Sequence, residues 1–231
     1  VRSSFVFCAA LAACGLVACG SSKPAEAPEA PPPPPPEPPK AKEPEAPPAP
    51  PAPVVIKDVG FATPESVLYD AAGDIYLVSN INGDPFGKDD NGFISKVTPD
   101  GKVAELKWID GSASKEVELN APKGLGISDG KLYVSDIDTV RVFDLATGKP
   151  AATVKIAGST FLNDIAVAPD GTVYVSDTGL KTGFAPNKKD AIYKIGKDNK
   201  SKALIKGADL KNPNGLSADD KGLTVVTWTG E

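Results

Sequence analysis

Short apolar runs interrupted by polar turns recur from residue 54 to the end of the chain. In these runs, β-branched and aromatic residues follow a turn, a pattern typical of a strand. Three of these runs contain a tyrosine, and Tyr76, Tyr133 and Tyr174 are spaced 57 and 41 residues apart. Three of the runs superimpose without gaps and a fourth is a weaker copy: 73–80, 129–136, 170–177 and 221–227.

Other strand-like segments accompany each run. One segment precedes every run, and two more follow each of the first three runs. The preceding segments are 64–68, 122–126, 162–166 and 213–217. The following segments are 93–98, 140–145 and 191–195, and then 103–107, 151–156 and 202–206. No stretch shows a convincing helical period of apolar residues.

Four short strands in each repeat of about 40–55 residues predict the blades of a β-propeller. The links between strands are too short for the crossovers of a parallel sheet, so we expect antiparallel pairing. A β-sandwich is the alternative, but it does not account for the repeat. The sequence therefore predicts an all-β domain over residues 54–231, with three complete blades and the first two strands of a fourth.

Residues 1–18 have the pattern of a targeting segment. A single basic residue, Arg2, precedes an apolar stretch over 5–18. This stretch is short for a membrane-spanning helix, which needs about 20 apolar residues, and it fits the apolar region of a signal peptide.

The end of that segment, Leu16-Val17-Ala18-Cys19, resembles a bacterial lipobox. The resemblance implies that residues 1–18 are a lipoprotein signal peptide and that Cys19 is acylated. It also implies a lipid-anchored protein of the bacterial envelope that faces the periplasm, with the outer membrane favoured because Gly20 follows the cysteine. An ordinary secretory signal that ends at Ala18, or a short buried helix, is the alternative.

Residues 19–53 form a proline-rich segment, since 16 of the 24 prolines fall between Pro24 and Pro53. Such a composition cannot pack a hydrophobic core. Polyproline II rises ~3.1 Å per residue, so about thirty residues could hold a domain up to ~90 Å from a membrane. We expect a tether; a ligand for a proline-binding module is the alternative.

The amino-acid composition excludes several kinds of catalytic and metal-binding site. The chain has no histidine, and all three cysteines precede Gly20. This excludes Ser-His-Asp triads, His-ligated zinc and any cysteine-rich zinc site in the propeller domain. With 25 basic against 30 acidic residues, the net charge of −5 argues against nucleic acid as a partner.

Several motifs carry a resemblance to a known family. The runs 163–171 and 214–216 resemble those of the SMP-30/gluconolactonase-like propellers. The runs 78–83, 106–109 and 121–124 are similar to those of a group of bacterial envelope propellers. The resemblance implies a propeller of about six blades, so we expect this chain, with about three and a half, to be truncated. A smaller propeller that closes by oligomerising is the alternative.

The repeat places Glu65, Lys123, Asn163 and Asn214 at the same point of successive blades. The family resemblance implies that Glu65, Asn163 and Asn214 bind Ca²⁺ or another divalent metal, with a further aspartate beyond Glu231. Lacking that aspartate, residues 1–231 are expected to show no binding at micromolar Ca²⁺ and no lactonase activity, which the resemblance implies for the full-length form. A lysine ammonium nearby would repel the metal unless Lys123 points to solvent or contacts an anionic substrate. Alternatively, the asparagines stabilise turns and Glu65 is a solvated loop residue.

Polar loops give weaker signals. The segments 83–92 and 179–190 are long and rich in Gly, so we expect them to wall a pocket. The acidic residues of the first segment, Asp84, Asp89 and Asp90, lack the spacing of a calcium-binding loop. Asp136 and Asp177 end their strands, where capping of turns is favoured over a role beside a metal.

Two functions from different classes follow. The resemblance implies a metal-dependent hydrolase of the lactonase type, in which the metal polarises a lactone or ester carbonyl and activates water. The alternative is a non-catalytic propeller that binds a small molecule in its channel or a protein of the envelope.

Overall fold

The computed structural model describes residue 33 and residues 53–229. The predicted signal peptide, Cys19 and nearly all of the proline-rich segment lie outside the described residues. No helix in the described part of the chain is long and apolar enough to cross a membrane.

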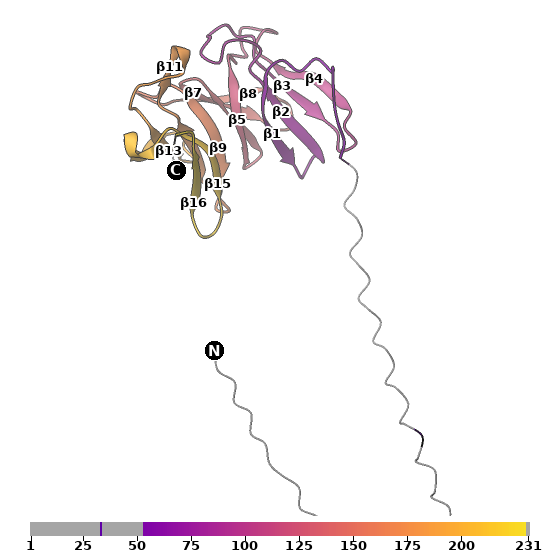
Figure 1. Cartoon of the computed structure of the whole chain (residues 1–231). Coiled ribbons are helices and arrows are strands. Elements are labelled where there is room, and N and C mark those ends of the chain that lie inside the picture. Colours follow the sequence, from indigo (N-terminus) through magenta and orange to yellow (C-terminus); the bar gives the residue numbers. More distant parts are fainter. Residues whose placement is uncertain (1–32, 34–52, 230–231) are drawn as a thin grey trace, which may run out of the picture. The chain divides into compact units, whose positions relative to one another are not determined.

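Residues 64–227 form antiparallel sheets that follow one another along the chain (Figure 1). Three sheets have four strands each, and the fourth has two among the described residues. The first comprises β1 (Pro64–Asp70), β2 (Ile75–Asn80), β3 (Phe93–Val97) and β4 (Val103–Asp110). The second comprises β5 (Pro122–Ser128), β6 (Lys131–Asp136), β7 (Thr139–Asp144) and β8 (Pro150–Lys155). The third comprises β9 (Leu162–Val167), β10 (Val173–Asp177), β13 (Ala191–Ile195) and β14 (Ser201–Lys206), and the fourth β15 (Pro213–Ala218) and β16 (Leu223–Thr227).

The only other elements of the described chain are short. A hairpin of β11 (Leu180–Lys181) and β12 (Ala185–Pro186) lies in the loop between β10 and β13, with the 3₁₀ turn η1 (Thr182–Phe184) at its tip. A second 3₁₀ turn, η2 (Ala208–Leu210), precedes β15. The predicted strands are confirmed, and the fold is an all-β partial propeller of about three and a half blades.

The blades pack through their innermost strands, which neighbour one another in the order β1, β5, β9 and β15 (Figure 1). One apolar cluster, which includes Leu77, Leu125 and Phe143, lies between the first two blades. Another, which includes Tyr133, Val142 and Ile165, lies between the second and third. Burial of apolar side chains between blades is therefore the main force that holds the repeats together.

A serine near the end of β2, β6 and β10 adds a polar connection between blades. Ser79, Ser135 and Ser176 are fully buried. Ser135 donates to the Asn163 carbonyl of the next blade, and Ser176 Oγ donates to the Asn214 carbonyl at 2.6 Å. These bonds fix where β9 and β15 begin relative to the preceding blade.

The ungapped superposition of the runs 73–80, 129–136 and 170–177 is confirmed by the pairing of the strands. Register pairs Leu77 with Leu68, as it pairs Tyr133 with Gly126 and Tyr174 with Ala166. Leu77 is thus the equivalent of Tyr133. Because side chains alternate along a strand, the one-residue offset turns Tyr76 to the opposite, exposed face of its sheet.

Candidate functional site

Glu65, Lys123, Asn163 and Asn214 each occupy the second position of an innermost strand. Since β1, β5, β9 and β15 are successive neighbours, the four residues lie in one row at the end of the blades where these strands begin. We call this end the strand-start face. The structure therefore brings the predicted residues to one face from four blades.

Capping of the preceding loops positions this row. Asp136 accepts hydrogen bonds from the backbone N–H of Asn120 at 3.2 Å and Ala121 at 2.8 Å. Asp177 accepts from Thr160 and Phe161, both at 3.0 Å. Asn80 accepts from the Ala62 N–H in the first blade at 3.0 Å. Each of these side chains ends the second strand of its blade and holds the chain just before the innermost strand, as the capping interpretation predicts.

Lys123 does not point to solvent, because only 1% of its surface is exposed. Its ammonium donates to the carbonyls of Pro85 at 3.1 Å and Ala121 at 2.9 Å. It also lies 4.6 Å from the centre of the Phe161 ring. Burial lowers the pKa of Lys123 to about 8, against the opposing effect of Asp136, Glu65 and Asp84. The side chain thus fastens the loop 81–92 to the strand-start face.

Glu65 lies within electrostatic reach of Lys123 and of a second acid, Asp164. Although much of the Glu65 residue is exposed, nearby protein atoms desolvate its carboxylate. This desolvation raises its pKa to about 7; the Lys123 ammonium acts against the rise, and the Asp164 carboxylate adds to it. Together with Asp164, the row therefore forms a charged site with two acids and one buried lysine.

Asp164 is a site residue that the sequence argument did not select. Its oxygens accept the N–H of Ile165 at 2.8 Å and of Leu216 at 2.7 Å, which joins β9 to β15. Burial raises the pKa of Asp164, while these two N–H donors act to lower it. A carboxylate directly after Asn163 was the signal for it, but the contact with Leu216 spans two blades and has no local pattern.

Asn163 is buried and Asn214 is half-buried. Their backbone carbonyls accept hydrogen bonds from Ser135 and Ser176, whereas no partner for either side-chain amide is found within residues 53–229. The two amide oxygens therefore remain available to a ligand.

The donor chemistry at the strand-start face fits a hard divalent cation. Glu65 and Asp164 supply carboxylate oxygens, and Asn163 and Asn214 supply amide oxygens, which are the donors that Ca²⁺ prefers. A cation there would offset the repulsion between the two acids, which contributes to the raised pKa of Glu65. Within the described residues, no three Asp, Glu, His or Cys side chains gather closely enough to hold a metal without amide or water ligands.

The two long loops meet over this face, at the Phe86 and Phe184 rings, whose centres are 5.2 Å apart. The acidic residues of the loop 83–92 are used in local turns. Asp84 accepts the Phe86 N–H at 3.0 Å, and Asp89 accepts from the Asn91 amide at 2.7 Å. This arrangement supports a wall above the row rather than a calcium-binding loop.

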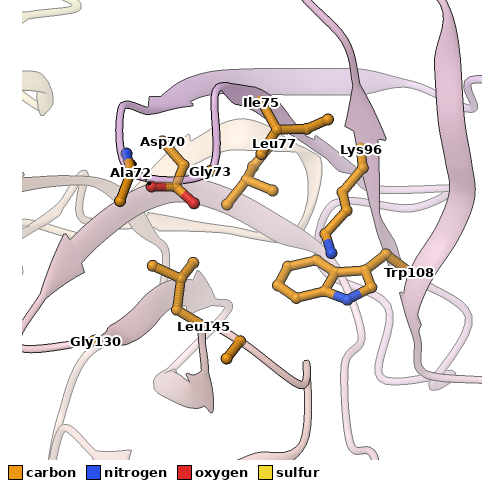
Figure 2. A pocket seen from close by; sticks show the side chains of 10 residues that line it. Asp70, Ala72, Gly73, Ile75, Leu77, Lys96, Trp108, Gly130 and Leu145 are labelled. Atoms are coloured by element: carbon orange, nitrogen blue, oxygen red, sulfur yellow. Dashed lines mark hydrogen bonds between the residues drawn. The ribbon is translucent and has the colours of Figure 1, made fainter.

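A separate cavity of about 450 Å³ lies between the first two blades on the opposite face. Figure 2 shows Asp70 and Leu145 on one side of it and Lys96 with Trp108 on the other. The Lys96 ammonium is 4.0 Å from the centre of the Trp108 ring. None of the four residues of the row lines this cavity.

Comparison with known protein families identifies the family of this chain. The family model described as the SMP-30/gluconolactonase/LRE-like region matches residues 64–227. A search of curated proteins finds no significant match. The crystal structure of a protein provisionally assigned as a gluconolactonase aligns with a TM-score of 0.49 and 18% identity, over 73% of this chain and 57% of that protein. The chain thus spans little more than half the length of that protein. Because the family model covers most of the chain and every described blade, the protein belongs to the SMP-30/gluconolactonase/LRE-like family.

Proposed function

We propose that the protein is a metal-dependent hydrolase of lactones or esters, with its site on the strand-start face. Membership of the SMP-30/gluconolactonase/LRE-like family supports this reaction class. The observation that carries the proposal is the row itself: Glu65, Asn163 and Asn214 hold one register position in three innermost strands. Asp164 adds a second carboxylate within electrostatic reach of Glu65, and for this reason we expect activity from this chain although the sequence alone predicted none.

The residues of this site would have three roles: binding the metal, holding the strands in place and closing the loop. Glu65, Asp164, Asn163 and Asn214 would hold the divalent cation. When bound, such a cation supplies Lewis-acid polarisation of a carbonyl. Asp164 keeps the starts of β9 and β15 at a fixed separation through its bond to Leu216. Lys123 keeps the loop 81–92 closed over the face through the Pro85 carbonyl, which restricts the access of bulk water.

The alternative, a non-catalytic binding propeller, is favoured by one observation. The buried Lys123 ammonium already offsets part of the negative charge of Glu65, so the row is partly neutralised without a metal. In that case the face would bind a ligand or an envelope protein without hydrolysing it.

We further propose that Cys19 is acylated and anchors the protein to the bacterial membrane, facing the periplasm, with the outer membrane favoured. The lipobox-like run 16–19 supports this location. Expressed in a bacterium, the chain should incorporate labelled palmitate and sediment with membranes. The Cys19→Ala variant should remain unlabelled; an unlabelled, soluble wild type would contradict the anchor.

Calcium titration tests the metal site. Four oxygen-bearing side chains leave several positions to water, so we expect a dissociation constant of about 10⁻⁴–10⁻³ M, the range of extracellular calcium sites. In calorimetry, Glu65→Gln should weaken binding at least about tenfold, because it removes one of two carboxylates. Glu105→Gln, which changes an exposed acid of β4, is the matched control and should bind as the wild type does.

Hydrolysis is followed on the same proteins with a panel of lactones and a pH indicator. We expect turnover that requires the divalent cation and is lost in Glu65→Gln but kept in Glu105→Gln. Turnover that persists in chelator and in Glu65→Gln would overturn the proposal. Ligand binding without turnover of any lactone or ester would instead establish the non-catalytic alternative.

A further inference from the structure

Four aromatic side chains gather above the strand-start face: Phe86, Phe161, Phe184 and Trp228. Ring centres are 4.5 Å apart for Phe86 and Phe161, and 5.2 Å apart for Phe86 and Phe184. Trp228 extends the group, with its ring 5.9 Å from that of Phe184 in an edge-to-face arrangement. We call these residues the aromatic cluster.

The cluster is continuous with the row of site residues. Phe161 directly precedes β9, which carries Asn163, and its ring lies against the Lys123 ammonium. Trp228 directly follows β16, and its backbone N–H donates to the Asn212 carbonyl at 2.9 Å, two residues before Asn214. Phe86 and Phe184 come from the two long loops. Residues far apart in sequence thus contribute one aromatic wall beside the candidate site.

The aromatic cluster is not fully buried between the loops. Phe184 is 49% exposed and Trp228 is 54% exposed, so the cluster presents ring surface to solvent. Phe184 also has a φ of +59°, in the left-handed region that a bulky residue seldom adopts. A strained backbone that displays an apolar ring next to a polar site is the combination expected of a residue with a binding role.

The charges beside the aromatic cluster restrict the chemical class of ligand that it can bind. Lys123, whose ammonium contacts the Phe161 ring, is buried and engaged with two backbone carbonyls, so it is not offered to an anionic ligand. What the cluster offers is neutral ring surface, which attracts other flat rings by stacking and edge contacts.

We propose that the aromatic cluster stacks the ring of the substrate, and that the substrates are aryl lactones or aryl esters. This rests on the proposed function for the hydrolytic step, but the recognition of the ring is independent of it. Phe184 and Trp228 form the exposed part of the wall, and Phe86 and Phe161 support them from the loop and from the start of β9.

Binding is measured on the full chain with lactams, which resemble lactones but resist hydrolysis. The lactam analogue of dihydrocoumarin is the aryl probe, and caprolactam and gluconolactam are the aliphatic and polyol probes. In calorimetry the aryl lactam should bind most tightly. Phe184→Leu and Trp228→Leu should each weaken it about 3- to 10-fold and leave the other two unchanged. Tyr69→Leu removes an equally exposed ring outside the cluster and should have no effect.

Tryptophan emission gives an independent readout. The aryl lactam should change the emission of the wild type, and Trp228→Phe should abolish that change although Trp108 remains. Equal affinity for all three lactams, or unchanged aryl binding in both leucine variants, would overturn the stacking proposal. Selective aryl binding without hydrolysis of dihydrocoumarin would support the stacking proposal and contradict the proposed hydrolase function. Metal-dependent hydrolysis without a preference for aryl substrates would support the hydrolase function and contradict the stacking proposal.

Discussion

Among single residues, Lys123 has a different role from the one that its position in the strand predicts, because its side chain is buried. Its register places it beside Glu65 and Asn163, where an ammonium would act on a substrate or repel a metal. Instead, its charge is satisfied by the Pro85 and Ala121 carbonyls and by the Phe161 ring. The loop 81–92 therefore depends on a buried cation, and its stability should depend on pH.

We expect the protonation of Lys123 to be visible in a comparison with Lys123→Met. The pKa is about 8 in the folded chain against 10.5 for an ordinary lysine, so the unfolded chain binds the proton more tightly. The free energy of unfolding of the wild type should therefore rise, relative to the variant, between pH 8 and pH 10.5. The gain is at most about 3 kcal/mol and is measured by urea denaturation at several pH values. A difference that stays constant with pH would contradict this origin.

At the scale of elements, the close approach of β5 and β9 depends on a glycine. A Cβ atom on Gly124 would lie 2.5 Å from the Asp164 Cα and 2.6 Å from the Ile165 nitrogen. These are backbone atoms and cannot rotate away. The same strand position in β15 is Gly215, where a Cβ would meet nothing closer than 3.7 Å. The two glycines thus form a natural pair for testing blade packing.

Gly124→Ala should destabilise the domain by about 1–3 kcal/mol, because the added methyl group forces β5 and β9 apart. Gly215→Ala should be neutral or stabilising by up to about 1 kcal/mol, since it fits the space and restricts the unfolded chain. Thermal and urea denaturation of both variants measures the difference. Equal effects would show that the separation of β5 and β9 is adjustable.

At the scale of the whole domain, the first blade displays a sheet face that the other blades cover. Val67 is 64% exposed, whereas Leu125 and Ile165, which hold the same register position in the next two blades, are 4% and 5% exposed. In those blades the preceding sheet covers the residue. Val226, in the fourth sheet, is 63% exposed at the position of the buried serines.

We expect purified residues 54–231 to associate as the concentration rises, since exposed apolar faces of this kind pack when partners meet. Val67→Lys combined with Tyr76→Lys should reduce the average mass in sedimentation velocity by placing charges on the open face. Ala113→Lys, on an exposed loop, controls for the added charge. A monomer at all concentrations in the wild type would show that these faces do not associate.

The local pattern of the sequence determined the strands of this protein and their grouping into blades. Alternation and turn residues act over a few positions, so the strands of the four blades, β1–β10 and β13–β16, could be located from runs such as 129–136 and 170–177. The same register placed Glu65, Asn163 and Asn214 in one row. The lack of histidine also fixed which chemistries the domain cannot perform.

Only the tertiary structure decided what surrounds that row. The Asp164 bond to Leu216, the burial of Lys123 under the loop 81–92, and the meeting of Phe86, Phe184 and Trp228 all join segments from different blades. Such contacts follow from how whole sheets pack, and no short-range pattern in the chain encodes them.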